Sequence, residues 1–109
     1  MQINNLSENN SILNHYLKEI RSVEIQGDPM RFRRNMERIG EIMAYEISKT
    51  MKFENEDVKT PLGIAPTNVI SEKVVISTIL RAGLPFHQGF LSYFDRAENA
   101  FVSAYRKYK

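Results

Sequence analysis

Two arginine positions are the part of this sequence best suited to chemistry on a charged ligand. Arg81 begins the tripeptide Arg81-Ala82-Gly83 directly after an apolar run, and Arg106 directly follows a second run that ends at Tyr105. A guanidinium carries a planar fork of donors that matches phosphate oxygens, and a small residue and a glycine let backbone amides approach an anion. If the two runs are neighbouring parallel strands, both arginines leave the sheet at one edge and can hold one polyphosphate.

Each of these positions also has an ordinary structural explanation. An Arg-Ala-Gly turn after a strand is common, with a glycine in the turn and a solvated arginine beside it. Arg106 also begins the basic run Arg106-Lys107-Tyr108-Lys109, which could be a frayed tail. Spacing alone therefore leaves both the anion site and the plain turn open.

The elements that would position the two arginines form one βαβ unit. Residues 74–80 are β-branched and apolar almost throughout, which is typical of a strand buried on both faces of a parallel sheet. Phe86, Phe90 and Phe94 follow at helical spacing, and residues 100–105 resume a strand pattern. We expect both strands to lie parallel, but two strands and one helix cannot cover both faces of a sheet. The core therefore reads as incomplete, or as half of an obligate assembly.

Two helices and an arm should precede this unit. Apolar residues recur at helical spacing over about 10–22, with Ser7 or Asn9 placed to cap that helix, and again from Met30 to about Thr50. Asp28-Pro29 supplies the capping acid and first-turn proline for the second helix, and Gly40 is a possible point of close packing. We expect one α/β domain with an N-terminal helical segment over 1–52, a β-hairpin or arm over 53–72 and the start of a parallel-sheet core over 73–109.

The amino-acid composition excludes several classes of function. The 109 residues include 42% apolar types, 26% charged types and a formal charge of +2, which is typical of a folded domain and too small a charge to require a polyanion partner. The absence of cysteine excludes disulfides and thiolate chemistry, and two histidines make a zinc site improbable. The beginning of the chain lacks a signal-peptide pattern and no run reaches membrane-span length, so we expect a cytoplasmic protein.

Other polar groups have simpler explanations than a site. Arg31, Arg34 and Arg38 could form a phosphate or RNA patch, but helical spacing places them beside Glu37 and Glu41, so we expect a solvated, ion-paired face. The two histidines, His15 and His87, have no carboxylate or second histidine at ligand spacing. We assign neither of them to a metal or to catalysis.

Several motifs resemble one enzyme family. The run from Val75 to Gly89, centred on Ile79-Leu80-Arg81-Ala82-Gly83-Leu84, resembles the strand-and-loop signature of uracil phosphoribosyltransferases, and Tyr105-Arg106 is similar to the pair that closes the next strand in that family. Upstream motifs similar to the family's N-terminal helix and arm occur in the same order: Arg31-Phe32-Arg33, Gly40 with Tyr45-Glu46, and Thr60-Pro61-Leu62-Gly63. The resemblance spans nearly the whole chain, and its specific part is the central six-residue run.

The resemblance implies a fold, a reaction and roles for individual residues. It implies the first βαβ unit of a phosphoribosyltransferase-type parallel sheet, in which Arg81, Ala82 and Gly83 contact the pyrophosphate of phosphoribosyl pyrophosphate and Arg106 contacts the same ligand. The implied enzyme is a glycosyltransferase of the pentosyltransferase type that converts uracil and phosphoribosyl pyrophosphate to uridine monophosphate and pyrophosphate in pyrimidine salvage. It also implies magnesium bound with the phosphoribosyl pyrophosphate, and a homodimer.

The chain departs from the family's pattern at three places. Ser77-Thr78 stands where the family tends to have a Val-Pro pair, and Lys107-Tyr108-Lys109 stands where acidic residues usually follow the arginine. The acidic stretch followed by Ala-Thr-Gly-Gly, which holds the ribose phosphate in this family, and the C-terminal uracil pocket are absent from the sequence. We therefore expect an N-terminal half that is inactive alone.

Two alternatives stay open at this point. A phosphoribosyltransferase-like regulatory module that binds nucleotides or RNA is compatible with the basic helix and the basic end of the sequence. A non-catalytic interaction fragment would use the arm and an exposed sheet edge for assembly. A steep salt dependence of binding would favour RNA, whereas dependence on Arg81 and magnesium would favour pyrophosphate recognition.

Overall fold

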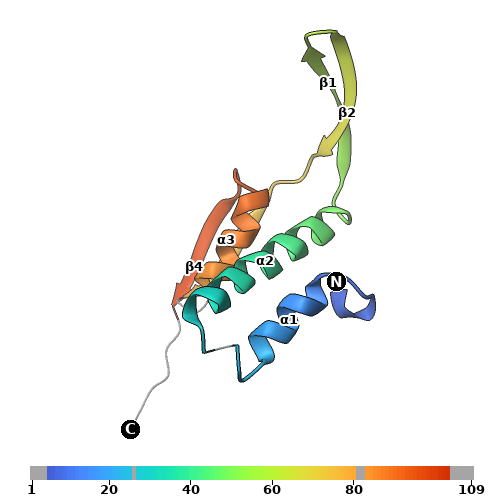
Figure 1. The fold of residues 1–109 in the computed structure, drawn as a ribbon. Helices are drawn as coiled ribbons and strands as arrows, with labels where there is room; N and C mark the ends of the chain where they lie inside the picture. Colours follow the sequence, from blue (N-terminus) through green and yellow to red (C-terminus); the bar gives the residue numbers. More distant parts are fainter. Residues whose placement is uncertain (1–4, 26, 81–82, 104–109) are drawn as a thin grey trace.

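The long helix α2, Pro29–Ser48, lies between the other two α-helices (Figure 1). The structure is a computed structural model that describes residues 5–25, 27–80 and 83–103. Helix α1, Leu13–Arg21, packs on one side of α2, and helix α3, Leu84–Tyr93, packs on the other. A two-stranded sheet of β3 and β4 lies beyond α3, and the hairpin of β1 and β2 projects away from the helices.

The start of α2 follows the predicted capping pattern. Asp28 is the N-cap, and its Oδ1 accepts hydrogen bonds of 3.1 Å from the backbone N–H groups of Met30 and Arg31. Pro29 occupies the first turn, where a helix has no use for its missing N–H group. This predicted start is confirmed, and the helix ends at Ser48, two residues before the predicted Thr50.

The first helix begins later than predicted. A short 3-10 helix, η1, covers Leu6–Glu8 and is capped by Asn5, so Ser7 does not cap the α-helix. Helix α1 begins at Leu13, whose N–H donates to Ser11 Oγ at 3.2 Å. The predicted caps Ser7 and Asn9 were wrong because the polar side chain nearest the free amide of Leu13 belongs to Ser11.

The predicted arm is an antiparallel hairpin. Strand β1, Phe53–Thr60, pairs along its full length with strand β2, Gly63–Ile70. Gly63 has a φ of 131°, which only glycine adopts without strain, and it pairs with Thr60 across the turn. Most hairpin side chains are exposed, and Figure 1 shows the hairpin standing clear of the helices.

The predicted βαβ unit is present. Strand β3, Val75–Leu80, and strand β4, Glu98–Ser103, pair in parallel with α3 between them in the chain. The prediction that residues 74–80 are buried on both faces was wrong, because Ile76 is 9% exposed whereas its neighbour Val75 is 57% exposed. Helix α3 packs against one face of the sheet. The fold is therefore α/β with an incomplete parallel core.

Strand β4 begins earlier than its sequence pattern predicts. Glu98 and Asn99 are polar, yet both belong to the strand. Glu98 Oε1 lies 2.7 Å from Lys73 Nζ, and its backbone N–H donates to Val74 at 3.2 Å. The strand therefore starts where tertiary partners are available and not where the apolar run begins.

Helices α2 and α3 are in backbone contact at two glycines. A Cβ atom added to Gly40 would lie 3.2 Å from the Cα atom of Gly89, and one added to Gly89 would collide with the backbone of Glu37 and Glu41. The predicted close packing at Gly40 is confirmed. This contact fixes the position of α3, which in turn covers the sheet.

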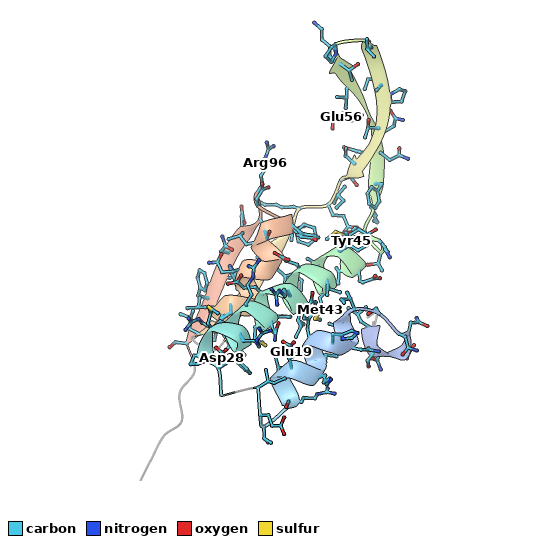
Figure 2. All side chains as sticks on the ribbon, viewed as in Figure 1. Glu19, Asp28, Met43, Tyr45, Glu56 and Arg96 are labelled. Carbon is cyan, nitrogen blue, oxygen red and sulfur yellow. The ribbon has the colours of Figure 1, made fainter. Side chains whose placement is uncertain are left out.

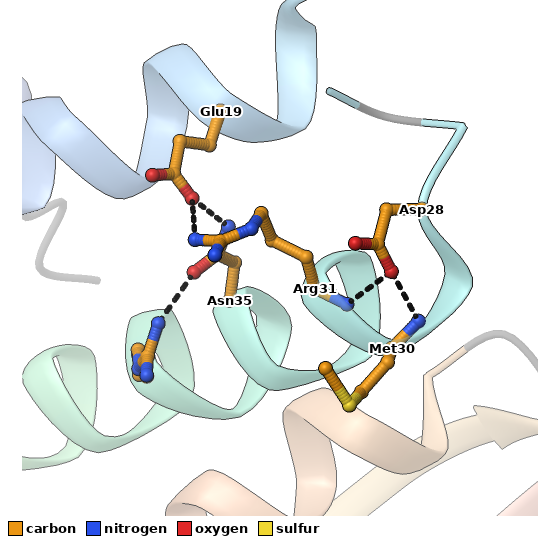
Figure 3. A network of polar contacts seen from close by, with 6 residues as sticks. Glu19, Asp28, Met30, Arg31 and Asn35 are labelled. Atoms are coloured by element: carbon orange, nitrogen blue, oxygen red, sulfur yellow. Dashed lines mark hydrogen bonds and ion pairs between the residues drawn. The ribbon is translucent and has the colours of Figure 1, made fainter.

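A polar network joins α1 to α2 (Figure 3). Glu19 Oε2 accepts a hydrogen bond of 2.6 Å from Asn35 Nδ2 and one of 3.3 Å from Arg31 Nη1. Asn35 is fully buried, and its Oδ1 accepts from Arg38 Nη1 at 3.0 Å. The Asn35 hydrogen bond, aided by Arg31 and Arg38, holds the pKa of Glu19 below its ordinary value of 4.5 against partial desolvation.

Within the described part of the chain, no helix is long and apolar enough to span a bilayer.

Candidate functional site

The two strands that precede the predicted arginines end side by side. Leu80, the last residue of β3, pairs with Ser103, the last residue of β4, in the parallel register. Arg81 and Ala82 follow Leu80, and Arg106 follows Ser103 by three positions. These three predicted site residues lie outside the residues that the structure describes, so their contacts stay a prediction. The strands that precede them end at one edge of the sheet.

Gly83, the fourth predicted site residue, is held between β3 and α3. Its N–H donates to Ile79 at 3.2 Å, and its carbonyl accepts from the N–H of His87 at 2.9 Å. A Cβ atom at this position would lie 2.8 Å from both the Ile79 carbonyl oxygen and Thr78 Cγ2. The φ of −77° is ordinary, so the chain needs glycine here because the turn folds back tightly on β3.

Helix α3 begins at the residue after Gly83. Leu84 and Pro85 open the helix, so the positive end of its dipole and its free first-turn amides lie next to Gly83, the N-cap. A parallel strand followed by a turn and a helix N-terminus is a common arrangement for binding phosphate. In the described part of the chain, β3, Gly83 and α3 follow one another in this order, and anion binding by the loop stays a prediction.

A buried histidine joins the three elements of the βαβ unit. His87 of α3 is 3% exposed, and its Nε2 lies 2.8 Å from Asn99 Oδ1 on β4. Its Nδ1 is hydrogen-bonded to the hydroxyl of Thr78 on β3. The ring of Phe101 lies beside the imidazole with 5.0 Å between the ring centroids. These contacts tie the middle of β3 and the start of β4 to the helix.

Sequence reasoning missed this role of His87. The available signal was that Thr78 is a polar residue at an inward-facing position of the strand, between Ile76 and Leu80. A search for ligand spacing along the chain could not find the group, because its members come from three elements. Thr78 is also one of the residues at which the chain departs from the family's pattern, and it takes part in a buried hydrogen bond.

The arginines of α2 are largely engaged by carboxylates and amides. Arg31 pairs with Glu19 at 3.3 Å, and Arg34 pairs with Glu37 at 2.8 Å. The guanidinium of Arg38 lies 5.4 Å from the centre of the Tyr16 ring. The predicted ion-paired face is confirmed for Arg31 and Arg34, although the partner Glu19 comes from α1. These contacts do not favour the RNA-binding alternative.

The side chain of Arg96 lies away from the candidate site. Figure 2 labels Arg96 at the turn that leads into β4, which is the end of the sheet opposite Ser103. Among residues 5–25, 27–80 and 83–103, no cluster of three or more histidine, aspartate or glutamate side chains could hold a metal ion.

Comparisons with known proteins agree on one family. The sequence model of the family "Uracil phosphoribosyltransferase" matches residues 7–109. A uracil phosphoribosyltransferase of Porphyromonas gingivalis is 61% identical over 109 residues, which are 100% of this chain and 50% of that protein. A uracil phosphoribosyltransferase of Sulfolobus acidocaldarius is 39% identical over 101 residues, which cover 90% of this chain and 46% of that protein. The chain thus spans about half the length of the curated relatives it matches.

The fold is also found in a solved structure. The AQ2163 protein from Aquifex aeolicus superposes with a TM-score of 0.72 at 27% identity, covering 85% of this chain and 44% of that one. The family match includes the hairpin, the strand β3 and the turn that follows it. Together with the paired strand ends at Leu80 and Ser103, these matches show that the chain belongs to the uracil phosphoribosyltransferase family.

Proposed function

We propose that the protein to which this chain belongs transfers the phosphoribosyl group of phosphoribosyl pyrophosphate to uracil. The products are uridine monophosphate and pyrophosphate, as in pyrimidine salvage. The observation that carries the proposal is the 61% identity to the Porphyromonas gingivalis enzyme along all 109 residues. The proposed reaction takes place in the cytoplasm, as the sequence predicts.

In this proposal the chain supplies the pyrophosphate end of the active site. The bond between the ribose carbon and the pyrophosphate oxygen breaks, the bond to the uracil nitrogen forms, and the proton of that nitrogen is released and taken up by the pyrophosphate product. The transition state resembles an oxocarbenium ion with a departing anion. Arg81 and Arg106 stabilise that anion with guanidinium donors, and Ala82 and Gly83 leave room for close approach of the backbone. Neither arginine transfers a proton, because a guanidinium stays protonated at all physiological pH values.

Magnesium enters the proposal with the substrate. The described residues offer no cluster of ligands for it. The phosphate oxygens of phosphoribosyl pyrophosphate are hard ligands of the kind that Mg²⁺ prefers. We therefore assign no residue of this chain to the metal and no step of the reaction to it.

A joined protein tests the proposed function directly. Residues 1–109 would be fused to the second half of the Porphyromonas gingivalis relative, since this chain matches 50% of that protein. We expect the joined protein to release pyrophosphate only when uracil is present. Arg81→Ala and Arg106→Ala should each reduce the rate at least tenfold, because each variant removes a charged donor to the leaving group. A tenfold loss corresponds to about 1.4 kcal/mol. Arg96→Ala is the matched control and should leave the rate unchanged, because Arg96 is exposed at the opposite end of the sheet. No turnover by the joined protein would contradict the proposal.

The projecting hairpin supports the proposed homodimer. A two-stranded hairpin is at best marginally stable alone in water. Here Ile64 is 71% exposed and Phe53 is 49% exposed. We propose that the hairpin packs on a second copy of the protein. Sedimentation equilibrium of the protein should give the mass of a dimer. The double variant Ile64→Ser, Phe53→Ser should give the mass of a monomer. An unchanged dimer would exclude the hairpin from the interface.

A further inference from the structure

The buried histidine of α3 is placed to control the turn at Gly83. We propose that His87 is a positioning residue that sets the backbone conformation of Gly83, acting through the side chain of Thr78. The inference rests on the proposed function for the identity of the ligand, a pyrophosphate group. Its structural part concerns Gly83, which the structure describes.

The hydrogen bonds around His87 have a definite direction. Asn99 Nδ2 donates to the carbonyl of Ala97 at 3.5 Å, so Asn99 Oδ1 is the atom that faces His87 Nε2 at 2.8 Å. An amide oxygen only accepts, so the hydrogen of the imidazole is on Nε2. In the tautomer with its hydrogen on Nε2, Nδ1 accepts from the hydroxyl of Thr78. The two side-chain partners hold the ring of His87 in one orientation.

The orientation of Thr78 follows from this hydrogen bond. A β-branched side chain carries its hydroxyl and its methyl group on one carbon, so fixing one of them fixes the other. With the hydroxyl on His87, the methyl group Cγ2 lies 2.8 Å from the position that a Cβ atom of Gly83 would occupy. Thr78 therefore contacts His87 on one side and Gly83 on the other.

His87 also holds Gly83 through the main chain. The N–H of His87 donates to the Gly83 carbonyl at 2.9 Å, and this is the first backbone bond of helix α3. The ring of Phe101 beside the imidazole restricts its rotation. At 3% exposure, His87 has no bulk water to replace a lost partner, so breaking either side-chain bond leaves a buried polar atom unpaired.

A loop held in place before the ligand arrives binds more tightly than one that must be ordered by the ligand. The contact from His87 through Thr78 reaches Gly83, which lies two positions after Arg81. The contact through Asn99 instead steadies the pairing of β4 at its second residue. Nδ1 therefore acts on the turn at Gly83, and Nε2 acts on the pairing of β4. Substitutions that remove one of these hydrogen bonds and keep the other can distinguish the two effects.

Two amide substitutions distinguish the contacts of the two ring nitrogens. Asn can place an oxygen near the position of Nδ1, so His87→Asn keeps the Thr78 bond and loses Asn99. Gln reaches the position of Nε2, so His87→Gln keeps the Asn99 bond and loses Thr78. In NMR spectra of the 109-residue chain without ligand, we expect the Gly83 amide signal and its hydrogen-exchange rate to change in His87→Gln and to stay close to wild type in His87→Asn.

The same variants are then titrated with inorganic pyrophosphate in the presence of magnesium chloride. We expect His87→Gln to bind about five- to tenfold more weakly than His87→Asn, which is the loss expected from one buried hydrogen bond. Thermal unfolding of each variant shows whether the fold is retained. If His87→Gln does not fold, Thr78→Val replaces it, because it removes the same hydrogen bond while keeping the shape of the side chain.

The outcomes separate this inference from the proposed function. If wild-type chain and joined protein both fail to bind pyrophosphate, the proposed function fails, and the Gly83 signal still tests the role of His87. If His87→Gln and Thr78→Val leave the Gly83 signal unchanged, or if His87→Asn changes it equally, the positioning role is overturned. If Gly83 changes as expected but pyrophosphate binding does not, the loop is positioned by His87 and the link to ligand affinity is wrong.

Discussion

Gly40 of α2 and Gly89 of α3 meet at the helix crossing with no side chain between them. The backbone of Glu37 and Glu41 closes the space around Gly89, and the carbonyl of Phe86 closes the space around Gly40. Neither neighbour is the flexible end of a side chain. The two helices can therefore accept a methyl group at this crossing only by moving apart.

Gly89→Ala should accordingly destabilise the protein. Alanine favours a helix by about 1 kcal/mol over glycine, but overpacking against a backbone costs about 3 kcal/mol, so the free energy of unfolding should fall by about 2 kcal/mol. Urea denaturation measures this loss. Gly27→Ala is the matched control, because a Cβ atom at Gly27 has no neighbour within 4 Å. Equal stability of the two variants would show that the crossing is looser than described.

Asp28→Ala should weaken the start of α2. The carboxylate accepts from two backbone amides, those of Met30 and Arg31, and loss of such a cap lowers stability by about 1 kcal/mol. Asp28→Asn keeps an oxygen acceptor and should retain most of the stability. Thermal unfolding distinguishes the two variants, and an equal drop for both would assign the effect to the negative charge of Asp28 and not to its hydrogen bonds.

Glu19 should make stability depend on pH in the acidic range. The hydrogen bond from Asn35 and the charge of Arg31 lower the pKa of Glu19 in the folded state. The carboxylate therefore stabilises the fold above its unfolded-state pKa, near 4.5, and this contribution is lost as the pH falls through the lower folded-state pKa. The difference in unfolding free energy between wild type and Glu19→Gln should be largest at pH 7 and shrink toward pH 3.

Glu24→Gln is the control for this measurement, because Glu24 is exposed and lies beyond the end of α1. Its difference from wild type should stay small at both pH values. A difference for Glu19→Gln that is the same at pH 7 and pH 3 would contradict the role given to the carboxylate.

Gly63→Ala should affect the hairpin without affecting the helices. A φ of 131° strains any residue with a Cβ atom by about 1–3 kcal/mol. Hydrogen exchange should speed up at amides of β1 and β2, while exchange in α2 stays unchanged. Leu62→Ala is the control, because Leu62 is fully exposed beside the same turn. Slower exchange in α2 alone, or no change in the hairpin, would contradict the assignment.

Much of the fold could be predicted because its signals are local. Asp28-Pro29 specifies a helix start within one turn, and the apolar run that ends at Leu80 specifies a strand by itself. The start of β4 at Glu98 was missed because its strand conformation depends on partners elsewhere, including Lys73. One-sided burial of β3 was also missed, since a strand pattern does not record how many neighbours are present to cover it.

The candidate site also has a part that could be predicted from the sequence and a part that could not. The motif around Arg81 and the position of Gly83 could be found along the chain, and the family that they indicated is confirmed. The group of Thr78, His87 and Asn99 could not, because its hydrogen bonds join three elements through the folded structure. The contacts of Arg81, Ala82 and Arg106 with a ligand stay predictions.

The two sheets differ in the number of residues that separate their paired strands along the chain. In the hairpin, Thr60 pairs with Gly63 across a turn, whereas Val75 pairs with Glu98 only after α3 has been folded between them. Closing a longer loop loses more chain entropy, and non-local strand pairing is slow. We therefore expect the hairpin to form and melt on the microsecond scale of isolated hairpins, while the parallel pair forms late and limits the folding rate.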